Sequence, residues 1–196
     1  MLLPHRSTLA LRCSVATLVA LAALAPLGCQ TDRSSSTGAM PARHDTSTSM
    51  PAATSDGEFA ATMAMHHTGA IEMARVEAQS GARADVRALA TKIVDAQSAE
   101  KPKLEAIARE TGHAGMQPDP MMEKHSMMDM QELKAARGGE VDRVFLTHMI
   151  DHHENGVKMA KAAMPNLRRD DLRRMATMMI DDQTREVSQM RAMLNQ

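Results

Sequence analysis

The sequence contains one stretch of residues twice, and this duplication constrains the fold more than any other feature. Residues 59–110 align with residues 145–196 at a constant offset of 86, without insertions or deletions. Each copy begins with a phenylalanine, has a methionine four positions later and then carries two adjacent histidines. These histidine pairs are His66-His67 and His152-His153. The repeat indicates two copies of one structural unit that bury their apolar faces against each other.

Each unit has the pattern of two helices joined by a helix-breaking pair, Ser80-Gly81 in the first copy and Pro165-Asn166 in the second. Glycine frees the backbone and proline lacks an N–H, so both residues end helices. We therefore expect helices over residues 57–79, 83–110, 140–164 and 168–195. No alternating strand pattern is present. The predicted fold is all-α, a four-helix bundle built from two repeated helical hairpins.

Polar side chains interrupt the apolar stripe of the first helix in each unit. A spacing of four, three, four and three residues selects one buried face of a helix. This face contains Phe59, Met63, His66, Ala70 and Met73 in the first copy, and Phe145, Met149, His152, Gly156 and Met159 in the second. His67 and His153 fall on the neighbouring apolar stripe. All four histidines thus lie within a wide apolar face, and the small residues after His66 and His152 leave room for a ligand.

The second helix of each unit carries a glutamine and a glutamate in the middle of its apolar stripe. These residues are Gln97 and Glu100, and Gln183 and Glu186. A buried carboxylate without a partner costs several kcal/mol, so each glutamate is expected to have one. Counting from the turn at Gly81 places His66 and Gln97 at the same height in an antiparallel hairpin, with Met63 and Glu100 one turn further along.

Two interpretations of this polar layer stay open. In one, His, Met and Glu side chains bind a metal ion. In the other, Glu100 pairs with His66 or His67 and the layer is structural. Adjacent histidines point about 100° apart around a helix, so we expect one of each pair to ligate a metal and the other to support it or to serve a neighbouring site. His148, one turn before His152, adds a candidate in the second copy alone.

The segment between the repeats, residues 112–139, is rich in side chains that bind metals. Its imidazole and thioether groups are His113, Met116, Met121, Met122, His125, Met127, Met128 and Met130. No core-forming period explains so many methionines in a polar stretch, which favours metal binding, although a Met-rich crossover packed on the bundle is the alternative. From Ser126 onward the segment has the composition of a short helix.

Methionine occurs 20 times in the 196 residues, and thioether sulfur is a soft ligand that suits Cu(I). No cysteine follows Cys29, which excludes thiolate zinc sites from the domain. We therefore expect a copper ion, with Cu(I) favoured and with Cu(II) or Ag(I) as further ions that fit. The candidate ligands are Met63, His66, His67, Met73, Glu100, His113, Met121, Met122, His125, Met127, Met128, His148, Met149, His152, His153, Met159 and Glu186.

The N-terminal segment has the pattern of an export signal. Residues 1–29 contain a basic start and an apolar run of about a dozen residues, too short to span a bilayer stably. They end in Leu27-Gly28-Cys29, which is similar to the lipobox of bacterial lipoproteins. We expect lipidation of Cys29, or plain secretory cleavage as the alternative. Residues 30–55 are rich in Ser, Thr, Pro and Ala and predict a flexible tether, followed by the helical domain over 56–196.

Two further classes of function are disfavoured by the composition. A formal net charge of -1 and the absence of Trp and Tyr argue against nucleic-acid binding. A di-iron oxidase of the ferritin type needs a Glu-x-x-His motif on each of two helices. That motif occurs once, at Glu110 and His113, so no enzymatic reaction is expected.

The two His-His segments, Met63 to His67 and Met149 to Ala160, are each followed by a helix with a Gln-x-x-Glu motif. Together they resemble the domain-of-unknown-function 305 family over about residues 56–196. The resemblance implies a ferritin-like helical bundle, export to the cell envelope and copper binding in some members. At Met65 the first copy departs from the usual pattern, which has proline or an acidic residue.

These observations predict an extracytoplasmic, lipid-anchored protein that binds copper or silver in metal sequestration or tolerance and that could form homo-oligomers. The alternatives are a structural or interaction bundle of the cell envelope that binds no metal, and a ferritin-like metal oxidase.

Overall fold

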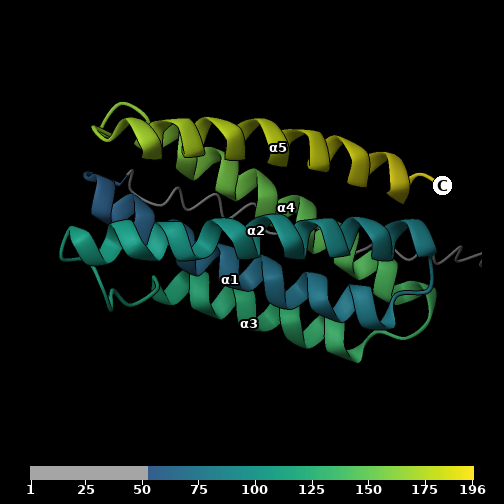
Figure 1. The fold of residues 1–196 in the computed structure, drawn as a ribbon. Coiled ribbons are helices and arrows are strands. Elements are labelled where there is room, and N and C mark those ends of the chain that lie inside the picture. The colour runs from purple at the N-terminus through teal and green to yellow at the C-terminus, as the bar shows by residue number, and fades with distance from the viewer. Residues whose placement is uncertain (1–52) are drawn as a thin grey trace, which may run out of the picture. The chain divides into compact units, whose positions relative to one another are not determined.

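The computed structural model describes residues 53–196, which form five helices and no strand (Figure 1). The helices are α1 (Asp56–Ser80), α2 (Ala84–Glu110), α3 (Pro120–Ala135), α4 (Gly139–Ala163) and α5 (Asp170–Leu194). The all-α class is confirmed, and the four helices of the two repeats begin and end within a few residues of their predicted bounds.

The four repeat helices form two antiparallel hairpins, α1 with α2 and α4 with α5 (Figure 1). The hairpins meet through α1 and α4, which run in opposite directions. Helix α3 packs on α1 and α4, whereas α2 and α5 do not pack closely against each other. The interface between α1 and α4 therefore lies at the centre of the five helices.

The segment between the repeats forms α3, and this helix begins at Pro120, earlier than the expected start near Ser126. The reason is local. The Asp119 carboxylate accepts hydrogen bonds from the N–H groups of Met121 and Met122, and Pro120 occupies the first helical position, where its missing N–H costs nothing.

Hydrogen bonds from side chains stabilise the start of helix α1. The Ser55 hydroxyl accepts a hydrogen bond from the N–H of Glu58, whose carboxylate accepts bonds from the Thr54 N–H and hydroxyl at 2.7 Å. The predicted leader with Cys29, and the tether up to residue 52, lie outside the described residues. Within residues 53–196 no helix has the length and apolarity that crossing a membrane requires.

The two repeats cap each other's second helices. The Asp142 carboxylate of α4 accepts a hydrogen bond from the Arg83 N–H, at the start of α2, at 3.0 Å. The equivalent Asp56 of α1 accepts one from the Arg168 N–H at 2.8 Å and a longer one from the N–H of Arg169, the residue at the start of α5, at 3.4 Å. Each carboxylate satisfies an N–H group that a helix start leaves without an intrahelical partner. The first helix of each hairpin thus completes the second helix of the other.

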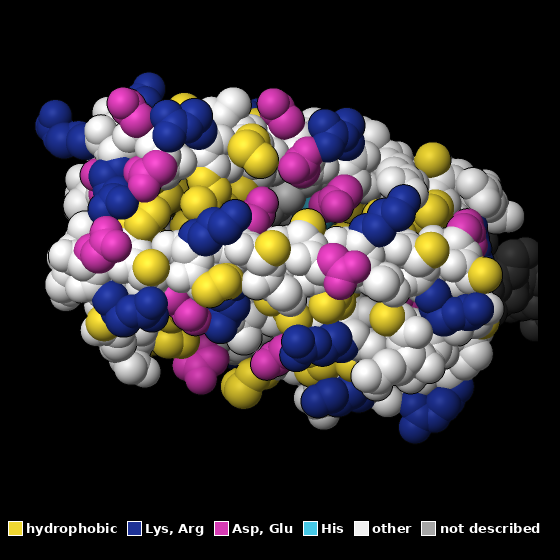
Figure 2. Space-filling view, viewed as in Figure 1, with side chains coloured by type: hydrophobic (Ala, Val, Ile, Leu, Met, Phe, Trp, Pro, Cys, Tyr) yellow, Lys and Arg dark blue, Asp and Glu magenta, His cyan; other side chains and the backbone are white. Residues whose placement is uncertain are grey.

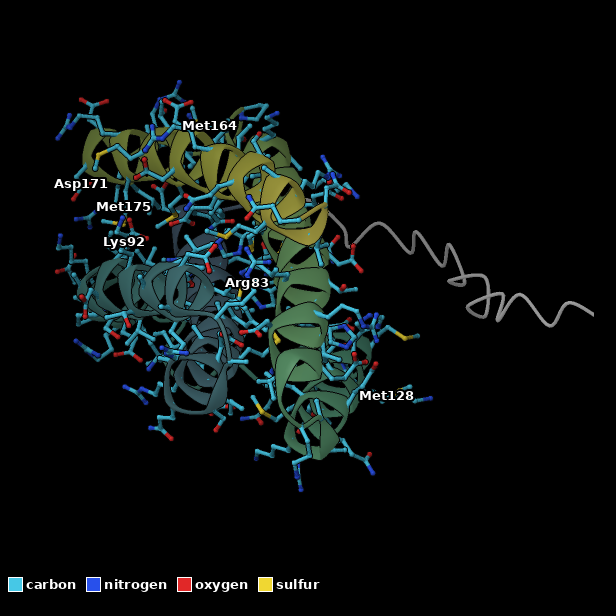
Figure 3. The ribbon with its side chains drawn as sticks, turned by 90° about the vertical axis from the view of Figure 1, so that its right-hand side faces the viewer. Arg83, Lys92, Met128, Met164, Asp171 and Met175 are labelled. Carbon is cyan, nitrogen blue, oxygen red and sulfur yellow. The ribbon has the colours of Figure 1, made fainter. Side chains whose placement is uncertain are left out.

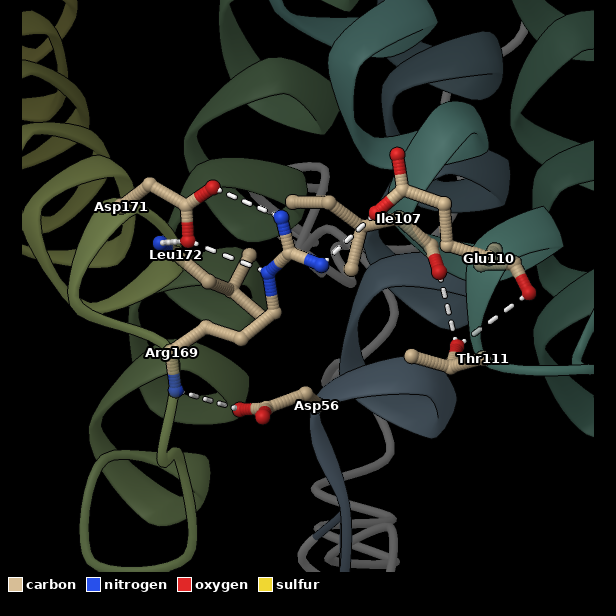
Figure 4. Close-up of polar contacts among 8 residues, drawn as sticks. Asp56, Ile107, Glu110, Thr111, Arg169, Asp171 and Leu172 are labelled. Carbon is tan, nitrogen blue, oxygen red and sulfur yellow. Dashed lines mark hydrogen bonds and ion pairs between the residues drawn. The ribbon is translucent and has the colours of Figure 1, made fainter.

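The Arg169 side chain reinforces this junction at the α5 end (Figure 4). Its guanidinium donates to Glu110 of α2 at 2.7 Å and to Asp171 of α5 at 2.9 Å. These groups are half-exposed, so each pair adds little stability by itself. Their joint effect is to fix the end of α2 relative to the start of α5.

Glu77 breaks the symmetry of the repeats, because the equivalent position in the second copy is Ala163. The Glu77 side chain is fully buried and its oxygens have no donor partner. Burial and the neighbouring Asp142 carboxylate raise the pKa of Glu77 to about 8, although the Arg87 charge partly opposes them. Near neutral pH the folded protein therefore keeps Glu77 protonated, beside the Asp142 carboxylate.

We predict that Glu77 lowers the stability of the protein as the pH rises. A carboxyl whose pKa is higher in the folded state than in the unfolded state holds its proton longer when folded, so the free energy of unfolding falls between about pH 4.5 and about pH 8. Thermal unfolding followed by circular dichroism at about pH 6 and about pH 8.5 measures this loss. Glu77→Gln should reduce the loss, whereas Glu72→Gln, on the exposed face of α1, should retain it. Equal pH dependence in both variants would contradict the assignment.

Candidate metal centre

The four histidines of the repeats lie together where α1 crosses α4. His67 and His153 are fully buried, His66 is 4% exposed and His152 is half-buried. The rings of His66 and His152 pack against each other with their centroids 3.8 Å apart and their planes tilted by 36°. The layer is therefore shared by the two repeats, each of which contributes one adjacent pair.

Space for this layer comes from Gly156 on α4, which has no side chain. A Cβ at Gly156 would lie 2.8 Å from Cε1 of His66 and 2.5 Å from Oε1 of Gln183. Both separations are too short for real contacts, so the imidazole and the amide occupy the volume that a larger residue would need.

Each hairpin contains one buried histidine–glutamate pair. Nε2 of His67 lies 2.8 Å from Oε2 of Glu100, and Nε2 of His153 lies at the same distance from Oε2 of Glu186. Each imidazole N–H donates to its carboxylate. Of the two partners that the sequence left open for Glu100, the structure therefore selects His67.

The most informative feature of the layer is a set of buried atoms without hydrogen-bond partners. They are Nδ1 of His66, His67, His152 and His153, and Oε1 of Gln97 and Gln183. Where Nε2 carries the proton and donates it, as in the His–Glu pairs, Nδ1 of a neutral ring keeps a lone pair. The same holds for His66, whose Nε2 donates to the carbonyl oxygen of His152 at 3.1 Å. Unpaired buried lone pairs are costly and point to a ligand.

Burial keeps His66 and His152 neutral. It lowers the pKa of His66 to about 3 and that of His152 well below its ordinary value, and the neighbouring imidazoles lower both further. A metal ion binds the neutral ring, so neither histidine must lose a proton before it can act as a ligand.

The predicted methionine ligands lie above and below the histidine layer. Met73 and Met149 belong to one apolar cluster, whereas Met63 and Met159 belong to the other. Met63 and Met73 lie on either side of His66 along α1, on the face that the sequence spacing indicates. Because α1 and α4 are antiparallel, each side of the layer also has one methionine from the second repeat.

His148 contacts α3 and does not join the buried pairs. Its Nδ1 lies 3.2 Å from Oδ1 of Asp129 and its Nε2 lies 3.0 Å from Oε2 of Glu132. Both carboxylates were missing from the sequence-based candidates. The spacing of His125, Asp129 and Glu132 on one helix face could have suggested them, once α3 is known to begin at Pro120.

The other candidates of the linking segment do not join the layer. Met121, Met127 and Met128 are about 60% exposed, at 59%, 62% and 59%, and Met128 projects outward from α3 (Figure 3). His125 is exposed and Met122 is half-buried on the same helix. His113 lines a separate hollow of about 400 Å³, together with Met65 and Met116, which sequence reasoning left out of the candidate set.

Within residues 53–196, no three His, Cys, Asp or Glu side chains are gathered as they would be around a bound ion. The buried layer has suitable donor atoms in one place, but a metal would need a methionine sulfur or a rotated imidazole to complete its coordination.

We predict that the His–Glu pairs contribute to stability without any metal. Glu100→Ala leaves the N–H of buried His67 without its partner and should lower the free energy of unfolding by about 1–3 kcal/mol. Glu105→Ala, one turn further along α2, removes an exposed pair with Lys101 and should cost about 0.5 kcal/mol or less. Urea unfolding of the metal-free variants measures both. Similar losses in the two variants would show that the buried pair contributes no more to the free energy of unfolding than the exposed pair does.

Solved structures similar to this chain share its helical fold. A DUF305 fragment from Deinococcus radiodurans has a TM-score of 0.66 at 24% identity, covering 74% of this chain and 99% of that one. A DUF305 protein from Streptomyces coelicolor, described as a candidate secreted protein, has a TM-score of 0.64 at 26% identity, covering 74% and 93%. CopM in its Cu(I)-bound form has a TM-score of 0.63 at 26% identity, covering 72% and 96%.

None of the curated proteins matches the chain. The sequence does match the model of DUF305, a domain of unknown function, and it does so twice, over residues 25–108 and 102–194. These two matches follow the duplication and together span most of the chain. The protein therefore belongs to the DUF305 family.

Proposed function

We propose that the protein binds Cu(I) or Ag(I) in the histidine layer between its two repeats. The observation that carries this proposal is the set of four buried Nδ1 atoms without partners. In two of these rings a carboxylate accepts the Nε2 proton, which is the arrangement that orients metal-bound histidines and raises their basicity.

The chemistry of the surrounding donors selects a soft ion. Met73 and Met149 on one side of the layer, and Met63 and Met159 on the other, are the thioether groups nearest to it along α1 and α4. Such a set suits Cu(I) and Ag(I) better than Zn(II), and no cysteine competes for the ion within the helical domain. Met side chains have three rotatable bonds, so a sulfur can turn toward an imidazole at little cost.

Structural relatives support the same class of ligand. CopM has been solved in Cu(I)-, Cu(II)- and Ag-bound forms, at 25–28% identity to this chain. The fold is therefore compatible with coinage-metal binding, and the histidine layer is where this chain has the donors for it.

We infer that the protein acts in the cell envelope by sequestering metal. The predicted leader ending at Cys29 favours export and lipid anchoring, and the predicted tether over residues 30–55 would let the helical domain stand away from the membrane. Sequestration needs no chemical step, so we propose binding rather than catalysis, and the proposal leaves a homo-oligomer open. The exposed methionines of α3 would serve as a weaker, outer set of ligands.

We predict that tight metal binding depends on the Nδ1 atoms of the layer. The double variant His67→Gln and His153→Gln keeps an amide N–H where each Nε2–H donates to a glutamate but removes both Nδ1 atoms. It should fold normally and bind Cu(I) about 100-fold more weakly or worse. Competition with a chromophoric Cu(I) chelator measures the affinity, and circular dichroism checks the fold.

The matched control changes the outer methionines. A triple variant with Met121→Leu, Met127→Leu and Met128→Leu alters exposed side chains and should lose weak sites while retaining the tight one. If this triple variant alone abolished tight binding, the buried layer would be structural and the proposed function would move to α3. If the wild-type protein bound neither Cu(I) nor Ag(I), a structural bundle without metal would be the better interpretation.

We predict a clear order of metal preference. Because the donors are imidazole and thioether groups, Cu(I) and Ag(I) should displace Zn(II) from the protein at equal concentrations. Metal analysis after dialysis against mixtures of Ag(I) and Zn(II) measures the preference. Retention of zinc in place of silver would be inconsistent with a methionine-containing site.

A further inference from the structure

The surface between α2 and α5 is hollowed into a groove of about 240 Å³, called here the α2–α5 groove. It is lined by Lys92, Ala96, Gln97 and Glu100 of α2 and by Gln183 and Glu186 of α5, among others. Charged side chains of both signs line the boundary between these two helices (Figure 2). The groove exists because α2 and α5 do not pack closely against each other. Helix α3 contacts α1 and α4 instead, so it does not cover the groove.

The floor of the groove is the outer edge of the histidine layer. Gln97 and Gln183 line it while only 4% exposed, and the Oε1 atom of each has no partner. Glu100 and Glu186 have side chains that are 19% and 22% exposed, and each binds a fully buried imidazole. Each glutamate therefore connects the groove to one histidine.

Helix α3 packs over the opposite side of the layer. A Cβ placed at Gly69 would lie 3.2 Å from Nε2 of His152 and 3.4 Å from Oγ of Ser126, which belongs to α3. Further along α3, Leu133 is 1% exposed and packs in the same core as α1 and α4. Helix α3 therefore covers the route to the histidines from its side.

We propose that metal ions reach and leave the histidine layer through the α2–α5 groove, where Glu100 and Glu186 are the carboxylates that contact the buried histidines. This inference rests on the proposed metal binding. Two carboxylates in the floor of a groove attract cations and speed their association. Arg185 does not offset them fully, because it pairs with Asp182. The unpartnered amide oxygens of Gln97 and Gln183 are the next donors inward.

The test narrows the groove and measures the rate of metal exchange. Ala96→Trp places an indole in the groove, whereas Ala88→Trp places one on an exposed part of α2 that does not line it. Wild-type and variant proteins are loaded with Cu(I) without oxygen and mixed in a stopped-flow instrument with excess chromophoric chelator. Ala96→Trp should slow both loading and release about tenfold and leave the equilibrium affinity unchanged, since a narrowed route affects both directions. Ala88→Trp should behave as the wild type does.

A charge variant tests the same route without adding bulk. Lys92→Glu, in the groove, should accelerate Cu(I) loading severalfold at low ionic strength and lose this effect at high salt, whereas Lys103→Glu, exposed elsewhere on α2, should not. The inference is overturned if Ala96→Trp exchanges metal at the wild-type rate or if both lysine variants behave alike. Failure of the wild type to bind Cu(I) would instead overturn the proposed function.

Discussion

The bond between a buried imidazole and a glutamate carboxylate is the interaction on which the centre of this protein depends. An apolar bundle tolerates His67 and His153 because Glu100 and Glu186 accept their Nε2 protons at 2.8 Å. Each carboxylate reaches the imidazole from the groove side, where it stays partly hydrated. The pair thereby avoids the full desolvation penalty of a buried ion pair, and it fixes which ring nitrogen has a free lone pair. A second consequence is orientation, because a histidine held at Nε2 presents Nδ1 to the interior.

Duplication turns one such pair into a composite centre. A single hairpin has one adjacent histidine pair, and its rings would face an open apolar surface. Antiparallel packing of α1 on α4 brings His66 against His152 and places one methionine from each repeat on either side of them. The centre belongs to the interface between the repeats. Packing and proposed function are therefore linked, since the contact that buries the two hairpins also assembles the donors.

Much of this arrangement could be predicted from the sequence, and what could not has a physical reason. The breaks near Gly81 and Pro165 and the apolar periodicity located four helices, and the seam that contains Gln97 and Glu100 located the polar layer. Counting residues along a helix could not distinguish His66 from His67 as the partner of Glu100, because adjacent residues differ in height by only about 1.5 Å and mainly by rotation. The early start of α3 followed from the capping by Asp119, a signal hidden in a stretch with proline. The contacts of His148 with α3 depend on packing between distant segments, which a sequence pattern does not specify.

The exchange of helix caps between the repeats has a consequence for how such a protein could arise. Asp56 completes the start of α5 and Asp142 completes the start of α2, so each half supplies what the other lacks. Each unit contains one such carboxylate and one such helix start. The carboxylate does not reach the helix start of its own unit, but it reaches that of the other unit across the interface. One unit alone could satisfy both by pairing with an identical copy around a two-fold axis. The present chain thus has the geometry of an ancestral homodimer fused into one polypeptide. Within one chain the two halves need not be identical, and Glu77 indeed stands where the other repeat has Ala163.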